Sequence, residues 1–129
     1  MIADLELALR GRSDPVVLCL GAHCDDIEIG CGGALLRLRE RLPGAEIHWA
    51  ILSGDARRHP EARESARRFL GDGAESRVRC FSFTDGFLPW EGAGVKATFE
   101  TPRIDVVRSV PSSGSSDLEL QPEITLILA

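Results

Sequence analysis

The chain has 129 residues and a net charge of −5, with 43% hydrophobic and 27% charged residues. This length predicts one domain, and the composition is that of an ordinary globular protein rather than a disordered one. The negative charge, with arginines scattered among carboxylates, argues against a nucleic-acid partner.

The sequence offers no segment suited to a membrane. Its longest apolar runs, at 16–20 and 124–129, are too short to cross a bilayer. The amino-terminal segment carries acidic residues where a signal peptide needs positive ones, so a cytoplasmic location is expected. The four cysteines include no CxxC pair and are expected to be reduced thiols: Cys19, Cys24, Cys31 and Cys80.

The first third of the chain predicts a helix, a strand and a second helix. Residues 2–11 suit a short amphipathic helix, and residues 16–22 suit a fully buried strand. The segment HCDDIEIGCGG after this strand is expected to be a loop. Over 34–42, leucines alternate with charged residues, which predicts a helix with one apolar face that ends before Pro43.

The middle of the chain continues the alternation of strand and helix. Residues 46–53 predict a strand, 60–70 a helix, 77–83 a third strand and 95–100 the start of a further helix. Such alternation predicts a Rossmann-like α/β fold, with a mainly parallel sheet covered by helices on both faces.

The sequence changes character after residue 100. Segment 101–121 is rich in proline, serine and glycine, and is interpreted as flexible or aberrant, with a loop at 111–116. Residues 122–129 suit one more strand. The expectation is a single domain over 1–129 with a core at 15–100, whose carboxyl-terminal part is either truncated or out of frame.

Three polar residues directly follow the first predicted strand: His23, Asp25 and Asp26. Ligands of open α/β sheets bind beyond the carboxyl ends of the strands. Imidazole and carboxylate groups are good zinc ligands, and a further carboxylate beside the metal can accept a proton from bound water. The simpler alternative is that both aspartates cap the next helix and that the histidine is packed.

A nucleotide-binding module is a further alternative for this fold. Gly30, Gly32 and Gly33 lack the GxGxxG spacing with which backbone approaches a pyrophosphate. Carboxylates that face an anionic phosphate are unfavourable without a cation. The sequence therefore favours a metal site over a nucleotide site.

The wider string GAHCDDIEIGCGG resembles the signature of the LmbE/PIG-L family of N-acetylglucosaminyl deacetylases, whose usual form is AHPDDxExGxGG. Cys24 replaces the proline of that form. The resemblance continues in family order through LSGD (52–55), RHPEARESARRFL (58–70) and DGFLPWEGAGVKATFE (85–100). It covers about residues 15–100.

The resemblance implies specific roles in a zinc-dependent hydrolysis. His23 and Asp26 are the implied zinc ligands, Asp25 the general base and Arg58 a residue that faces the substrate. Glu28 is implied to orient the ligands, although a solvated carboxylate at a helix start explains it as simply. The implied reaction removes the N-acetyl group from an N-acetylglucosamine-type sugar conjugate.

The resemblance does not supply the family's third zinc ligand, which lies in a later stretch of the type HxDH. No histidine follows His59 in this sequence. An incomplete enzyme that binds zinc weakly, or a non-catalytic remnant, is therefore expected. His59 is the candidate substitute because it lies in a loop, whereas His48 is expected to be packed within its strand.

Two tryptophans are the largest remaining side chains. Trp49 is expected in the core. For Trp90, anchoring of its loop is favoured over stacking on a sugar ring. Neither the group attached to the sugar nor the oligomeric state is defined by any pattern in the sequence.

Overall fold

The computed structural model describes residues 9, 11 and 15–100, and the backbone of 124–128. The helix predicted at 2–11 and the loop predicted at 111–116 lie largely or wholly outside these residues. In chain order the elements are β1 (Val16–Gly21), α2 (Asp26–Arg41), β2 (Glu46–Ser53), α3 (Arg58–Leu70), η1 (Ala74–Arg77), β3 (Val78–Phe83), η2 (Leu88–Trp90), α4 (Gly92–Glu100) and β4 (Ile124–Leu128).

The sheet has the order β3-β2-β1-β4, and each neighbouring pair is parallel. β1 lies inside the sheet, and its register with β2 runs from Val16 opposite Glu46 to Gly21 opposite Ile51. A strand with neighbours on both sides suits the continuous apolar run of β1. The predicted Rossmann-like α/β class with a parallel sheet is confirmed, including the strand expected within 122–129. The predicted cover of helices on both faces is not found in the described residues, where α2 and α3 lie on the same face.

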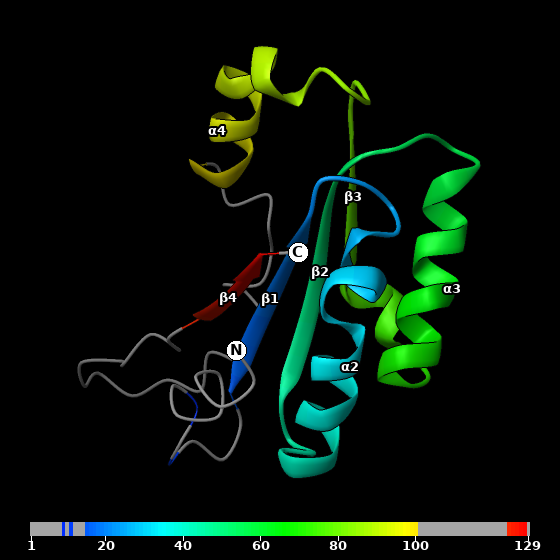
Figure 1. Cartoon of the computed structure of the whole chain (residues 1–129), viewed down its shortest axis with the longest axis vertical. Helices are drawn as coiled ribbons and strands as arrows, with labels where there is room; N and C mark the ends of the chain where they lie inside the picture. The colour runs from blue at the N-terminus through cyan, green and yellow to red at the C-terminus, as the bar shows by residue number, and fades with distance from the viewer. Residues whose placement is uncertain (1–8, 10, 12–14, 101–123, 129) are drawn as a thin grey trace, which may run out of the picture.

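The helices α2 and α3 pack side by side on one face of the sheet (Figure 1). The main core lies between this face and the two helices, and contains alternate residues of the strands, such as Val17 and Cys19 of β1 and Trp49 of β2. Leu18 and Ala50 belong to a smaller buried cluster, because successive residues of a strand point to opposite faces.

The start of α2 corrects one prediction. The helix begins at Asp26, so most of the segment predicted as a loop is helical. Within this helical segment, Gly32 serves the packing of α2 on α3. A Cβ at Gly32 would lie 2.8 Å from the ring of Phe69, which is closer than real contacts allow. Gly32 therefore allows the two helices to approach each other closely.

The other boundaries agree with the sequence to within a few residues. β2 has the predicted bounds, and α3 begins two residues before the predicted start. All four cysteines are unpaired thiols, as expected. Among the described residues, no helix combines the length and the apolar character that crossing a bilayer requires.

Candidate functional site

The turn after β1 is fixed to the end of β2. The carbonyl oxygen of Ala22 accepts two hydrogen bonds from Ser53, at 2.9 Å from the backbone N–H and at 2.7 Å from the hydroxyl. Ser53 is buried, and its hydroxyl hydrogen bond to Ala22 is partly buried. The residues that follow Ala22 therefore leave the carboxyl edge of the sheet in a defined direction.

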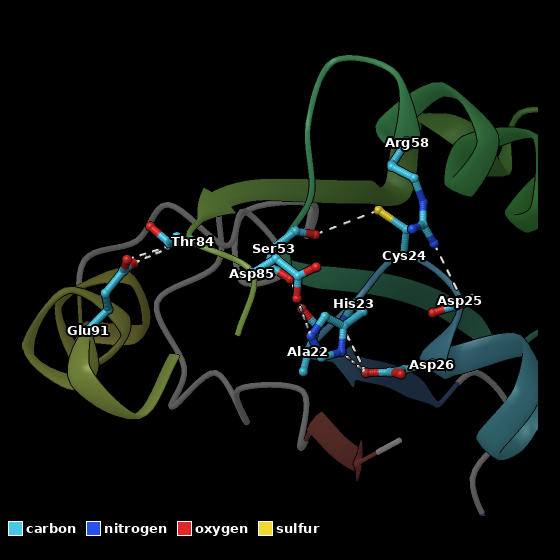
Figure 2. Close-up of polar contacts among 10 residues, drawn as sticks. All are labelled: Ala22, His23, Cys24, Asp25, Asp26, Ser53, Arg58, Thr84, Asp85 and Glu91. Carbon is cyan, nitrogen blue, oxygen red and sulfur yellow. Dashed lines mark hydrogen bonds and ion pairs between the residues drawn. The ribbon is translucent and has the colours of Figure 1, made fainter. Parts of the chain in front are cut away.

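His23 and Asp26 converge at this edge, as predicted. Nδ1 of His23 lies 3.3 Å from Oδ2 of Asp26, and the same oxygen accepts the backbone N–H of His23 at 2.9 Å (Figure 2). Asp26 is the first residue of α2, where the positive end of the helix dipole favours a carboxylate. Both side chains are partly exposed.

The spacing of these two atoms fits a shared metal ion. Two ligand atoms that are each about 2.1 Å from a zinc ion, at a tetrahedral angle, lie about 3.4 Å apart. The Nδ1 and Oδ2 atoms are 3.3 Å apart. Among the described residues, however, no group of three histidine, cysteine or acidic side chains is arranged to hold a metal. The described part of the chain thus provides two converging ligands.

Asp85 is a site residue that the sequence analysis missed. It follows β3, and its Oδ1 lies 2.9 Å from Nε2 of His23 (Figure 2). A carboxylate accepts and cannot donate, so this contact places a proton on Nε2. In the neutral ring, Nδ1 then keeps the lone pair that a metal requires. A signal was present in the sequence, because Asp85 comes two residues after a predicted strand and parallel strands end at one edge.

Asp25 does not cap α2. It occupies the position before the helix but makes no side-chain hydrogen bond to the helix backbone. Its Oδ2 lies 3.5 Å from a terminal guanidinium nitrogen of Arg58, in the first turn of α3. The alternative in which both aspartates only cap a helix therefore does not describe Asp25. Its carboxylate is about half exposed and is oriented toward Arg58 (Figure 2).

A cavity of about 370 Å³ opens between these segments. Its lining consists of His23, Cys24, Ser53, Gly54, Asp55, Arg58, Ser82, Phe83, Thr84 and Asp85. Asp25 and Asp26 lie outside this lining, but each contacts a residue within it, Arg58 and His23 respectively. The two aspartates are therefore at the edge of the cavity.

Cys24, the residue that replaces the family's proline, lies in the wall of the cavity. Its thiol contacts the carbonyl oxygen of Ser53 at 3.6 Å, and burial raises its pKa above the ordinary value. A Cβ on Gly54 would lie 2.7 Å from the sulfur of Cys24 and 2.8 Å from Nε2 of His59. This wall is closely packed around Gly54, which has a φ of +141°.

The other two histidines do not complete a metal site in the described residues. His59 lies in the first turn of α3 and not in a loop as expected. Its Nε2 is buried without a hydrogen-bond partner beside Gly54, and among the described residues it belongs to no group of three possible ligands. His48 is buried in β2 and contacts the carboxylate of Glu46. The expectation that His48 is packed is therefore confirmed.

Glu28 lies in α2 with its Oε2 buried and without a hydrogen-bond partner. Burial raises the pKa of the Cys24 thiol, and the charge of Glu28 adds a smaller effect in the same direction. Among the contacts of the described residues, none joins Glu28 to His23 or Asp26. The contact expected of an orienting group is made instead by Asp85.

Comparison of the chain with protein-family models, curated proteins and solved structures finds no match. The local resemblance of the motifs and the geometry of this edge of the sheet are therefore what point to a function.

Proposed function

We propose that the chain is a zinc-dependent N-deacetylase of the LmbE/PIG-L type that acts, in the cytoplasm, on an N-acetylglucosamine-type sugar conjugate. The observation that carries this proposal is the 3.3 Å separation of His23 Nδ1 from Asp26 Oδ2 at the mouth of a polar cavity. These two atoms are the proposed metal ligands. The residues around them support the same chemistry.

Asp25 is the proposed general base. Its carboxylate precedes a metal ligand in the chain and is not used by the helix, so it is free to accept a proton from water. Arg58 lies beside it and also lines the cavity. A guanidinium there keeps Asp25 oriented and offers hydrogen-bond donors to the oxygens of a sugar.

Asp85 is the proposed orienting group for His23. Metal-binding histidines usually donate their second ring N–H to a carboxylate or carbonyl, which fixes the ring and its tautomer. The 2.9 Å contact between Nε2 and Asp85 supplies this arrangement. A zinc ion in such a site supplies Lewis acidity, which polarises the amide carbonyl and lowers the pKa of a bound water.

The test separates the two aspartates. Asp25→Asn should retain zinc and lose about a hundredfold to ten-thousandfold in acetate release, because an amide cannot accept the proton. Asp26→Asn should lower zinc occupancy, because a neutral amide oxygen is a poorer ligand. Asp72→Asn is the matched control, since this exposed carboxylate pairs only with Arg67 among the contacts described.

Full turnover by Asp25→Asn, or loss of zinc from that variant instead of from Asp26→Asn, would overturn the assignment. A protein that binds zinc through His23 and Asp26 but releases no acetate is the non-catalytic remnant of such an enzyme. Binding of a nucleotide in the absence of a divalent metal would favour the nucleotide-binding module.

A further inference from the structure

His23 begins a tight turn that connects β1 to α2. The backbone N–H of Asp26 donates to the carbonyl oxygen of His23 at 3.4 Å, which closes a turn over residues 23–26. Asp25, its third residue, has a φ of −116° and a ψ of −5°, near the values of that position in a type I turn. Cys24 is the second residue, where type I turns favour proline because the ring fixes φ. His23 and Asp26 are the two ends of this turn, so its shape sets their separation.

Ser53, the last residue of β2, contacts the neighbours of His23 on both sides (Figure 2). On the amino-terminal side, its N–H and its hydroxyl donate to the carbonyl oxygen of Ala22, at 2.9 Å and 2.7 Å. On the carboxyl-terminal side, its own carbonyl oxygen accepts the thiol of Cys24 at 3.6 Å. One buried residue of the sheet therefore holds the chain immediately before and immediately after His23.

The sulfur of Cys24 is also enclosed by Gly54. Cys24 is only 7% exposed. A Cβ on Gly54 would lie 2.7 Å from this sulfur, so the sulfur fills the space that a side chain at residue 54 would need. The motif that the chain resembles has proline at residue 24, where the ring fixes φ covalently. In this chain, packing and a thiol hydrogen bond restrain the same residue.

We propose that Ser53 and Cys24 are positioning residues that hold the turn of His23 from both sides. They keep Nδ1 of His23 beside Oδ2 of Asp26, the two atoms that bind zinc in the proposed function, on which this inference rests. The hydroxyl of Ser53 and the thiol of Cys24 contact backbone carbonyls and not the metal, so both residues act through the chain. Asp85 differs from them, because it acts on the ring of His23 itself.

Such positioning matters most where a metal has few ligands. The described residues provide two, and any loss of order in the turn must be recovered from the free energy of zinc binding. One hydrogen bond changes an equilibrium by about twofold to tenfold. The backbone N–H of His23, which donates to Oδ2 of Asp26 at 2.9 Å, depends on the same order in the absence of zinc. The rate at which this amide exchanges with deuterium therefore measures the turn directly.

The experiment for Ser53 measures amide exchange in the metal-free chain, as the ratio of the His23 rate to the rate of Leu18 within β1. Ser53→Ala should raise this ratio about twofold to tenfold, because the turn alone loses a hydrogen bond. Ser53→Thr, which keeps a hydroxyl, should keep the wild-type ratio. Ser76→Ala is the matched control, since it removes a hydroxyl bond of similar length, 2.8 Å to the carbonyl oxygen of Gly73. A ratio that stays constant or falls in Ser53→Ala, as it would if the whole fold were weakened, overturns the proposal.

Cys24 is tested by two substitutions that both remove the thiol. Cys24→Ala should raise the exchange ratio and weaken zinc binding, each about twofold to tenfold, because nothing replaces the thiol contact. Cys24→Pro should keep both at wild-type values, because the ring fixes the second residue of the turn. The N–H of Cys24 has no hydrogen-bond partner among the described residues, so proline loses none there. Cys80→Ala, which removes a thiol from β3 outside the turn, is the control. Equal losses in Cys24→Ala and Cys24→Pro would overturn the proposal.

The two measurements separate this inference from the proposed function. Zinc affinity is obtained by competition with a chromogenic chelator, and amide exchange needs no zinc. If the exchange ratio responds as expected and wild type binds no zinc, Ser53 and Cys24 still hold the turn and the zinc-dependent deacetylase fails. If wild type binds zinc through His23 and Asp26 and no variant changes either measurement, the deacetylase stands and the positioning role is overturned.

Discussion

Nε2 of His23 lies 2.9 Å from Oδ1 of Asp85, although 61 residues separate them in the chain. The contact is formed because β1 and β3 run parallel within one sheet, so that both residues emerge at its carboxyl edge. The opposite nitrogen of the same ring faces Asp26 at 3.3 Å. His23 is thus held between two carboxylates, to which the proposed function gives different roles.

Asp85→Ala should weaken zinc binding about tenfold to a hundredfold, because the ring of His23 loses the partner that fixes its orientation and tautomer. Asp85→Asn should have a smaller effect, since an amide oxygen still accepts the N–H. Zinc affinity measured by competition with a chromogenic chelator checks this. Asp72→Asn serves again as the control, and equal affinity in Asp85→Ala and wild type would contradict an orienting role.

Replacement of Gly54 and of Gly33 by alanine should change the stability of the fold in opposite directions. Gly54→Ala should destabilise the fold by about 1–3 kcal/mol, because its positive φ is strained for other residues and the new Cβ would collide with Cys24 and His59. Gly33→Ala should stabilise by about 0.5–1 kcal/mol, since this exposed position in α2 has open space around it. Urea unfolding of both variants measures the difference. Equal effects would show that the packing around Gly54 is not as described.

The thiol of Cys24 should react slowly near neutral pH despite lining the cavity. Burial raises its pKa, and the thiolate is the reactive form, so a smaller fraction is reactive at pH 7 than in an ordinary exposed cysteine. Its rate of alkylation by iodoacetamide should continue to rise above pH 9, as followed by mass spectrometry of the Cys24 peptide. A rate that levels off below pH 8 would indicate a lowered pKa instead.

Zinc should protect Cys24 only modestly in the same assay. Cys24 is next to His23 in the chain, but its sulfur faces Ser53 and Gly54 rather than Asp26. A ligand of the metal would be strongly protected. Strong protection by zinc would therefore identify Cys24 as a metal ligand and contradict the ligand pair proposed here.

Much of the fold could be predicted from local patterns. The strand at 46–53 is rich in apolar residues, and the structure has it with the same bounds. The start of α2 could not be predicted in this way, because its glycines have low helix propensity and only the packing of Gly32 against Phe69 explains one of them. The packing of α2 on α3 outweighs the low helix propensity of glycine at this position.

The site was predictable where its residues are neighbours in the chain. His23, Asp25 and Asp26 lie within one turn, so their proximity follows from spacing alone. The contact of Asp85 with His23 could be predicted only with the order of the strands in the sheet. The exposure of Trp90 could be predicted only with the path of its loop. Neither is given directly by a sequence pattern. The orienting role was expected of Glu28 only because it matches the acidic residue after the DD pair of the resembled motif, and a solvated carboxylate explained it as simply.

The most direct test of the central claim is nuclear magnetic resonance of the histidine ring nitrogens in the uniformly ¹⁵N-labelled chain during addition of zinc. Binding should be weak, because the described residues provide two protein ligands and two give less affinity than three. The account predicts that Nδ1 of His23 shifts on zinc binding while Nε2 stays protonated, and that Asp26→Asn reduces this response. A shift at Nε2, or no response of His23 to zinc at all, would contradict it.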